Sequence, residues 1–238
     1  MSTVVVGYAR TAFARYSGAF ASVPATELGA AAVRAALERS GVRGDEVDFV
    51  YVGQVLQGAA GQNPGRQTAA AAGIPLTVPA LTLNAVCLSG TEAVIAGARF
   101  IDAGEADIVV AVGQESMTLA PHAWSGSRAG ARYGAVELVD TLEHDGLTDA
   151  FEHRSMGAST EERNAGLSLT REDQDRWAAS SHQRLASSAA FQAGELVPFE
   201  VRGRRGATLV AADDGLRADT TVETLGALRP AFGASGTI

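Results

Sequence analysis

Residues 107–113 of this 238-residue chain read Asp-Ile-Val-Val-Ala-Val-Gly, an apolar run without alternating polar positions. Such a run is typical of a strand that is buried on both faces, as in a parallel sheet covered by helices. Residues 47–55 and 80–83 have a similar character, and Val4–Val6 adds a β-branched run near the N-terminus. We therefore predict four strands in residues 1–117.

Alanine-rich segments separate these runs and predict helices over Thr26–Arg39, Pro64–Gly73 and Cys87–Ala103. Thr26 is a candidate N-cap, and Gly41 stands where a left-handed residue after a helix is expected. Pro64 suits a first helical turn, where its missing N–H needs no partner. The alternation predicts an α/β fold with a mixed, mostly parallel sheet and helices on both faces.

The pattern changes beyond Met117. Residues 125–134 are rich in Gly, Ser and Arg, and residues 136–162 show no clean period. Long loops inside a compact protein are usually functional. We therefore place a domain boundary near Met117, with a first domain over residues 1–117 and a second over residues 118–238.

Regular structure is expected again from Thr170 onward. Residues 170–193 predict a helix, because Thr170 and Asp173 resemble a capping box and Gly194 follows. Residues 195–210 and 221–228 are expected to be short extended segments.

Composition excludes several functional classes. The formal net charge is −8, all 19 positive charges are arginines, and the acidic excess argues against a nucleic-acid partner. No apolar run approaches the roughly 18 residues of a membrane span, and no basic n-region precedes an apolar stretch near the N-terminus. We expect a cytoplasmic protein without a membrane partner.

The histidines, the glycines and the single cysteine narrow the chemistry further. One cysteine, Cys87, excludes an internal disulfide and a multi-cysteine zinc site. His122, His144 and His153 lack the helical spacing of a metal-binding pair, so no metal is expected. Residues 88–97 contain no G-x-G-x-x-G pattern, which argues against a dinucleotide cofactor.

Cys87 lies in Asn-Ala-Val-Cys-Leu-Ser-Gly, residues 84–90, between a predicted strand end and a predicted helix start. A thiol there is close to the positive end of the helix dipole and to unpaired backbone N–H groups, which favour a thiolate and can hold an oxyanion. This position suits a nucleophile. The alternative is that Cys87 is a small buried hydrophobic residue, the more common role of a lone cysteine.

Residues 84–90 resemble the N-x-x-C-x-S-G motif around the nucleophilic cysteine of the thiolase family, the acetyl-CoA acetyltransferases and 3-ketoacyl-CoA thiolases. Further segments are similar to motifs of that family and occur in the same order: 8–13 (YARTAF), 53–56 (GQVL), 61–67 (GQNPGRQ), 113–118 (GQESMT), 145–151 (DGLTDAF), 156–157 (MG), 170–175 (TREDQD) and 228–232 (LRPAF). The resemblance covers nearly the whole chain.

The resemblance implies a fold of two thiolase halves in an α/β/α/β/α arrangement, with an α+β loop domain inserted in the first half. It implies that Cys87 takes an acyl group from acyl-CoA and that its backbone N–H is one oxyanion donor. Leu147 and Met156 would line the pantetheine channel, and Arg217 would lie beside the CoA nucleotide. Coenzyme A thioesters are then substrates, and no cofactor is expected.

The chain also departs from the family pattern. The G-N-A-S, N-E-A-F, G-H-P-x-G and C-x-G-x-G motifs, which supply the histidine and the second cysteine, do not occur. We therefore expect the first thiolase half without its last strand, plus the loop domain, with the C-terminal half absent. Ser155 stands where relatives often carry histidine. Leu88 replaces a small residue and either narrows the acyl site or packs at the helix start.

Three interpretations compete. The first is an acyltransferase of acetoacetyl-CoA synthesis or thiolysis, within fatty acid metabolism, that works through an acyl-Cys87 and needs a complementary C-terminal chain. The resemblance implies a homo- or hetero-oligomer for it. The second is a non-catalytic subunit that binds CoA or serves assembly. The third is a degenerate product that does not fold, because an exposed sheet edge and an uncovered apolar face are expected. Arg128 and Arg132 either meet CoA phosphates or are solvated.

Overall fold

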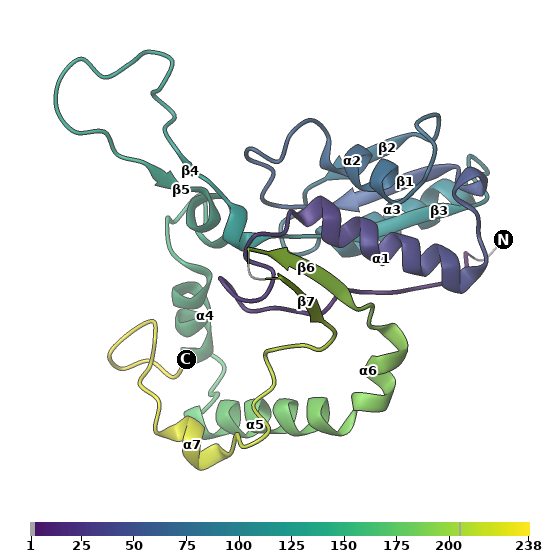
Figure 1. Cartoon of the computed structure of the whole chain (residues 1–238). Coiled ribbons are helices and arrows are strands. Elements are labelled where there is room, and N and C mark those ends of the chain that lie inside the picture. Colours follow the sequence, from purple (N-terminus) through teal and green to yellow (C-terminus); the bar gives the residue numbers. More distant parts are fainter. Residues whose placement is uncertain (1–2, 205) are drawn as a thin grey trace. The chain divides into compact units, whose positions relative to one another are not determined.

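A computed structural model describes residues 3–204 and 206–238 of the chain. These residues form two compact units (Figure 1). Unit 1 holds the residues up to Gly146 together with Glu195–Asp214, and unit 2 holds Leu147–Gly194 and Gly215–Ile238. This division differs from the boundary expected near Met117, because residues 118–146 and 195–214 pack with unit 1.

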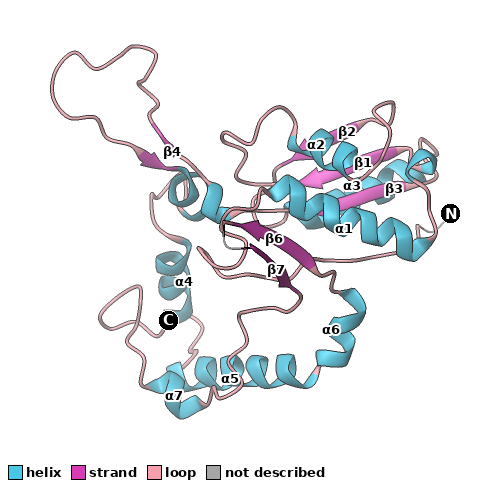
Figure 2. Cartoon of the chain, in the orientation of Figure 1, coloured by secondary structure: helices cyan, strands magenta, loops and turns pink. Residues whose placement is uncertain are grey.

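Unit 1 is built on a parallel sheet whose strands have the order β2-β1-β3 (Figure 2). The strands are β1 (Phe49–Gly53), β2 (Ala80–Leu83) and β3 (Val109–Gly113). Val50 of β1 lies opposite Ala80 of β2 and Val110 of β3. All three strands fall within predicted segments, so the parallel sheet is confirmed.

Two helices, α1 (Ala25–Ser40) and α2 (Pro64–Ala71), cover one face of this sheet. Val50 and Val52 of β1 are fully buried there, in one cluster with Val33 of α1 and Ala69 of α2. Side chains two apart on a strand share a face, which explains why the alternate valines enter the same cluster. Burial of each such side chain contributes about 1.5–3 kcal/mol.

The other face of the sheet is covered by α3 (Ser89–Asp102). Phe49 and Tyr51 point to this side, and the centroid of the Phe100 ring lies 5.2 Å and 6.3 Å from theirs. Gly97 of α3 lies directly over Val109 of β3, where a Cβ atom would approach the valine to 2.9 Å. The predicted arrangement of helices on both faces is confirmed.

The ends of the helices agree only partly with the local signals. Gly41 adopts φ +71° after α1, as predicted, but the N-cap of α1 is Pro24 and not Thr26. Thr26 lies inside the first turn because the helix begins one residue before it. The helix that was predicted to begin at Pro64 does so, and Asn63 caps it by accepting a hydrogen bond from the N–H of Arg66.

The fourth predicted strand, Val4–Val6, does not form within the described residues. Its three valines are 67–77% exposed, and no other strand pairs with them. β-branched residues favour extended backbone, but a strand requires a neighbour that accepts and donates its ladder hydrogen bonds. The prediction was wrong because the sequence run alone does not supply that neighbour.

A hairpin of β6 (Phe199–Gly203) and β7 (Gly206–Val210) also belongs to unit 1. Phe199 packs edge-on against Phe20, with ring centroids 5.5 Å apart. Phe20 belongs to a second apolar cluster with Ala12, Val23 and Leu28. The extended segment predicted over 195–210 is therefore confirmed for residues 199–203 and 206–210.

Short elements complete unit 1. They are η1 (Gly44–Glu46), η2 (Met117–Leu119), the strands β4 (His122–Ala123) and β5 (Val139–Asp140), and the start of the π-helix η3 (Glu143–Leu147). An open loop joins β4 to β5 (Figure 1). Arg128 and Arg132 lie in that loop and are exposed, as expected for solvated charges.

Unit 2 is helical. It holds α4 (Met156–Ala165), α5 (Arg171–Ser187), most of α6 (Ala189–Glu195) and α7 (Val222–Gly226). The capping box of Thr170 and Asp173 is confirmed at the start of α5, but the single helix predicted over residues 170–193 breaks at Ser188. None of the helices in the described residues combines the length and apolar character needed to cross a bilayer.

The segment 221–228 was predicted to be extended, and this was wrong. Thr221 and Thr224 form a reciprocal pair of hydrogen bonds, in which each hydroxyl accepts from the other residue's backbone N–H. That pair starts the helical turn of α7. Two threonines three residues apart thus act as a helix start, although their β-branched side chains suggested extended backbone.

Candidate active site

The three strands of the sheet end at one edge, where Gln54, Asn84 and Gln114 are the first residues after β1, β2 and β3. Parallel α/β sheets bind their ligands at this carboxyl edge. Cys87 lies in the turn between β2 and the start of α3 at Ser89, and it is exposed. This exposure argues against the interpretation of Cys87 as a small buried hydrophobic residue.

The turn that carries Cys87 is tight and strained. Val86 adopts φ +50°, a left-handed conformation that costs a β-branched residue about 1–3 kcal/mol. Asn84 Oδ1 accepts a hydrogen bond from the N–H of Val86 at 2.8 Å. The Ser89 hydroxyl donates to the carbonyl of Val86 at 2.6 Å and accepts from the N–H of Ala85 at 3.0 Å. Asn84 and Ser89 therefore hold the strained residue that precedes Cys87.

The backbone N–H of Cys87 has no hydrogen-bond partner within the described part of the chain, although its neighbours do. The N–H of Leu88 donates to Ala85 and that of Ser89 donates to Val86. Together with the positive end of the dipole of α3, a free N–H beside a thiol suits a developing oxyanion. The arrangement fits nucleophilic attack by Cys87 on a carbonyl or thioester carbon.

Glycines bring the start of α3 close to the sheet. A Cβ atom on Gly53 would lie 2.4 Å from the carbonyl carbon of Ser89, so no other residue fits at this position without a shift. Gly90 and Gly113 also face each other, with a Cβ on Gly113 placed 3.3 Å from the Cα of Gly90. The glycines at the ends of β1 and β3 thereby fix the distance between the sheet and the turn that carries Cys87.

The two apolar residues beside Cys87 are exposed. Val86 is 49% exposed and Leu88 is 66% exposed. Leu88 therefore does not pack at the helix start within unit 1, which was one of its two expected roles. Its side chain is free to contact an acyl group or a partner.

The G-Q-N-P-G-R-Q motif of residues 61–67 supports the loop before α2. Asn63 Nδ2 donates to the carbonyl of Ala80, and Asn63 Oδ1 accepts from Thr82 Oγ1. Gln67 Nε2 donates to the carbonyl of Ala60, and the guanidinium of Arg66 donates to the carbonyl of Val78. These residues tie α2 to β2 and have a structural role.

The motif at residues 8–13 is also structural. Arg10 forms a bidentate pair with Asp213 at 2.7 Å and 3.0 Å, and it contacts Glu195 at 2.8 Å. The hydrogen bond from Arg10, together with the N–H of Phe13, lowers the pKa of Asp213 against the opposing effect of desolvation. The motif anchors the hairpin of β6 and β7 to the N-terminal segment.

A buried chain of amide side chains lies below the carboxyl edge, and no role was predicted for its members. Gln114 is 8% exposed and donates through Nε2 to Gln54 Oε1 at 2.8 Å. Gln114 Oε1 accepts from Thr68 Oγ1 at 2.7 Å and sits where a Cβ on Gly29 would collide with it. Glu115 stands next to this chain. A signal was present for the two glutamines, since Gln54 and Gln114 are the first residues after β1 and β3.

The other predicted site residues belong to unit 2. Leu147 ends the π-helix, Met156 is the first residue of α4, and both are exposed. The backbone N–H of Arg217 donates to His182 Nδ1 at 3.3 Å. Ser155 caps α4 by accepting a hydrogen bond from the N–H of Ala158, so the residue that replaces the expected histidine has a structural use.

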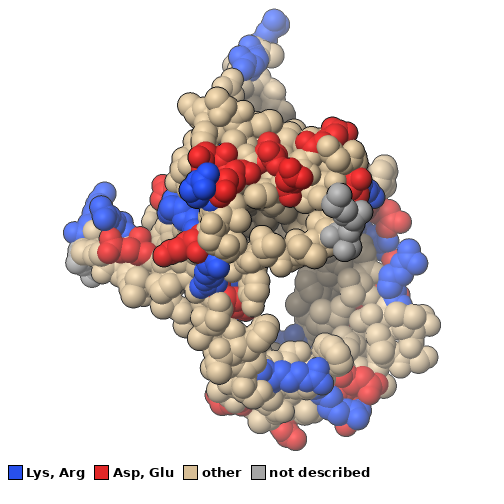
Figure 3. Space-filling view, turned by 90° about the vertical axis from the view of Figure 1, so that its right-hand side faces the viewer, with Lys and Arg blue, Asp and Glu red and all other residues tan. Residues whose placement is uncertain are grey.

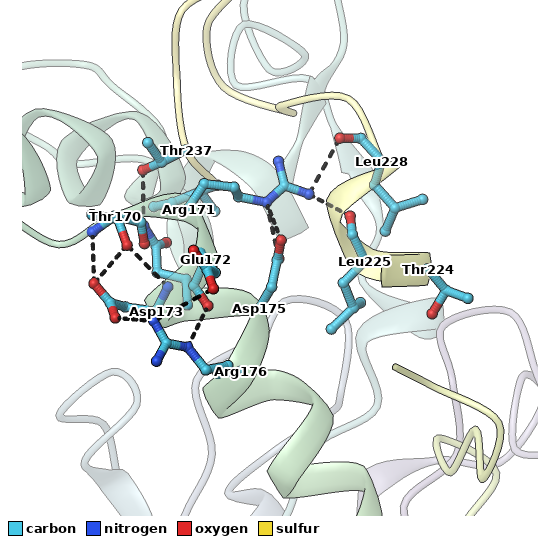
Figure 4. A network of polar contacts seen from close by, with 12 residues as sticks. Thr170, Arg171, Glu172, Asp173, Asp175, Arg176, Thr224, Leu225, Leu228 and Thr237 are labelled. Atoms are coloured by element: carbon cyan, nitrogen blue, oxygen red, sulfur yellow. Dashed lines mark hydrogen bonds and ion pairs between the residues drawn. The ribbon is translucent and has the colours of Figure 1, made fainter. Parts of the chain in front are cut away.

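A polar cluster in unit 2 connects α5 to α7 (Figure 4). Arg171 contacts both carboxylate oxygens of Asp175 at 2.9 Å and donates to the carbonyls of Leu225 and Leu228. Nearby, Glu161 accepts hydrogen bonds from the N–H groups of Thr237 and Ile238 at 2.7 Å and 2.8 Å. The N–H of Ile238 and then that of Thr237 lower the pKa of Glu161.

The histidines do not form a metal site in the described residues, where no group of three His, Cys, Asp or Glu side chains is placed to hold an ion. His144 contacts Asp145 at 2.7 Å, and His122 lies 3.9 Å from Asp140.

On the face in Figure 3, acidic and basic side chains are interspersed.

Comparison with known proteins places this geometry in a family. The family model described as "Thiolase, N-terminal domain" matches residues 3–238. The chain therefore belongs to the thiolase family, through its N-terminal domain.

Named relatives agree with this assignment. A "Probable acetyl-CoA acetyltransferase" of Mycolicibacterium smegmatis is 47% identical over 99% of this chain, and an "Acetyl-CoA acetyltransferase" of Chromobacterium violaceum is 46% identical over 100% of it. The crystal structure of the Bacillus anthracis acetyl-CoA acetyltransferase superposes with a TM-score of 0.95 at 33% identity, over 100% of this chain and 60% of that one. The chain spans 61% and 62% of the length of the two relatives.

Proposed function

We propose that this chain is the nucleophile-bearing part of an acetyl-CoA acetyltransferase of the thiolase type. The observation that carries the proposal is the exposed Cys87 just before α3, whose backbone N–H has no hydrogen-bond partner among the described residues. Thiolates attack thioesters readily, and the acyl-cysteine that results keeps the acyl group activated.

In the first half-reaction, Cys87 Sγ attacks the carbonyl carbon of acetyl-CoA. A new S–C bond forms, the C–S bond to CoA breaks, and CoA leaves as a thiolate that takes up a proton. The negative charge that develops on the carbonyl oxygen is held by backbone N–H groups, that of Cys87 among them. Asn84 and Ser89 stabilise the turn in which this N–H lies.

In the second half-reaction, a base removes an α-proton from a second acetyl-CoA, and the α-carbon attacks the carbonyl carbon of the acetyl group on Cys87. A C–C bond forms, the bond between that carbonyl carbon and Cys87 Sγ breaks, and Cys87 leaves as a thiolate while acetoacetyl-CoA is released. This step needs a further base and donors for the enolate oxygen. Because the chain has one cysteine and spans about 61% of the length of its relatives, we propose that a complementary C-terminal half supplies them.

Unit 2 is proposed to bind the CoA part of the substrate. Leu147 and Met156 are exposed apolar side chains suited to the pantetheine arm, and Arg217 suits a phosphate of the nucleotide. We further propose an oligomeric, cytoplasmic enzyme of fatty acid metabolism, as the resemblance of the sequence motifs to the thiolase family implies.

The experiment mixes this chain with a separately produced polypeptide that carries the remaining part of the Chromobacterium violaceum relative. Acetoacetyl-CoA formation and thiolysis are expected with the wild-type chain and are expected to be abolished by Cys87→Ala, while the complex still assembles. Equal activity of the wild-type and Cys87→Ala complexes would contradict the catalytic role of Cys87. A stable wild-type complex without activity would contradict the proposed acyltransferase function.

The second candidate is a non-catalytic subunit that binds CoA or serves assembly. The exposed Val86 and Leu88 beside Cys87 favour it, since they suit a protein surface as well as an acyl group. On this account the chain binds acetyl-CoA or a partner but transfers no acetyl group, and Cys87→Ala leaves the affinity unchanged. Isothermal titration calorimetry measures the binding, and the assay of acetoacetyl-CoA formation distinguishes the two functions.

A further inference from the structure

One peptide group at the carboxyl edge, between Val55 and Leu56, forms hydrogen bonds on both sides. Glu115 Oε2 accepts from the N–H of Leu56 at 3.3 Å and from that of Val55 at 2.9 Å. The carbonyl of Val55 accepts from Asn84 Nδ2 at 3.3 Å. Three strand ends therefore meet at this peptide, since Val55 follows β1, Asn84 follows β2 and Glu115 follows β3.

The peptide group connects Glu115 to the turn of Cys87. Since the N–H of Leu56 points at Glu115, the carbonyl of Val55 points the opposite way, toward Asn84. That carbonyl selects the amide orientation of Asn84 in which Nδ2 faces it. Asn84 Oδ1 is then free to accept from the N–H of strained Val86, the residue before Cys87.

The support below this peptide is rigid. The carbonyl of Leu56 accepts from Gln54 Nε2 at 2.9 Å, and Gln54 is in turn held by the buried Gln114. The second carboxylate oxygen of Glu115, Oε1, is buried without a hydrogen-bond partner in the described residues. A buried carboxylate oxygen without a hydrogen bond lowers the stability of the fold, so stability alone does not explain Glu115. Buried polar atoms without hydrogen-bond partners are expected at functional sites.

We infer that Glu115 is a positioning residue for Cys87, acting through the Val55–Leu56 peptide and Asn84. It fixes the direction of that peptide, and the peptide fixes Asn84, which holds Val86 in its left-handed conformation. This conformation sets the backbone geometry of Cys87, the next residue. The inference deepens the proposed function and rests on it.

A matched control lies at the opposite edge of the same sheet. Asp48 Oδ2 accepts from the N–H groups of Asp107 and Ile108 at 2.8 Å and 2.9 Å, just before β1 and β3 begin. As in Glu115, one carboxylate oxygen receives two successive backbone N–H groups. Asp48 is far along the strands from Cys87, so it reports the structural cost of losing such a contact without the positioning effect.

The experiment measures the rate of Cys87 alkylation by iodoacetamide as a function of pH, in the whole chain. Labelling is confined to one site because Cys87 is the only cysteine. The variants are Glu115→Ala, Glu115→Gln and Asp48→Ala, and thermal unfolding of each is recorded beside the rate. Glu115→Gln keeps an oxygen that can accept hydrogen bonds from both N–H groups. It also replaces Glu115→Ala in the comparison if that variant does not fold.

We expect Glu115→Ala to slow alkylation about tenfold and to alter its pH profile, while Asp48→Ala leaves both unchanged. Glu115→Gln is expected to recover most of the rate. If the Glu115 variants that fold match Asp48→Ala in rate and pH profile, the inference is overturned and the proposed function stands. If wild-type Cys87 is alkylated no faster than a cysteine in an unstructured peptide, the proposed nucleophile fails, and this inference fails with it.

Discussion

The two units of the chain are stabilised in different ways. In the described residues, the buried hydrophobic side chains lie in unit 1, with the exception of Ala179. Unit 2 instead holds the buried Asp175 and the contacts of Arg171 and Glu161 with backbone groups. Unit 1 is thus stabilised mainly by apolar burial and unit 2 mainly by charged hydrogen bonds.

This difference agrees with the work proposed for each unit. A nucleophile needs a fixed geometry, and the packed sheet with its glycine contacts provides one around Cys87. A region with few buried apolar contacts opens more easily. Unit 2 carries Leu147, Met156 and Arg217, the residues proposed to meet a long substrate, and its polar contacts make it the more sensitive unit to charge and pH.

The largest effect is expected from a charge in the core of unit 1. Val50→Asp places a carboxylate where the side chain is fully buried, at a cost of about 4 kcal/mol in the free energy of unfolding. Urea unfolding of the chain measures it. Val4→Asp is the matched control, because Val4 is exposed, and it should change the free energy little. Similar losses for both variants would contradict the apolar core described for unit 1.

A smaller and more local effect is expected from Arg171→Ala. The variant leaves Asp175 without its cation and frees two carbonyls of the α7 region, which costs about 2 kcal/mol in unit 2. Hydrogen exchange should rise in α5 and α7 and stay unchanged in the sheet of unit 1. Arg176→Ala on the same helix, which removes exposed ion pairs, serves as control. Exchange that rises equally in both units would argue against their independence.

The smallest effect concerns pH. The N–H groups of Ile238 and Thr237 lower the pKa of Glu161 below its ordinary value of 4.5. A carboxyl group whose pKa is lower in the folded state stabilises it fully above the ordinary value, and this stabilisation is lost as pH falls through the folded pKa.

An NMR titration of the Thr237 amide should therefore show a transition below pH 4.5 that Glu161→Gln removes. Glu172→Gln, an exposed carboxyl group on α5, should leave the titration unchanged. A transition that persists in Glu161→Gln would show that another group holds these amides.

The parts of the fold that the sequence predicted depend on local signals. Pro64 after a capping Asn63, Gly41 in a left-handed conformation, and the box of Thr170 and Asp173 each act within a few residues. The buried apolar runs located β1, β2 and β3. The strand prediction that failed depends on a partner distant in the sequence. Val4–Val6 has the composition of a strand, but no strand pairs with it in the described residues.

The same distinction applies to the candidate site. The position of Cys87 between a strand and a helix was predictable from seven residues, 84–90, whereas its role as the nucleophile is a proposal that rests on the resemblance of these residues to the thiolase motif. Glu115 was not predictable, because its contacts are to Val55 and Leu56, 60 and 59 residues away along the chain. Only the topology of the parallel sheet brings these residues together.

The most direct test of the central claim is mass spectrometry of the chain after incubation with acetyl-CoA, alone and with the complementary half. Our account predicts one added acetyl group, located on the peptide that contains Cys87 and absent from Cys87→Ala. An acetylated complex that carries its label elsewhere, or an assembled complex without any acetyl group on Cys87, would contradict it.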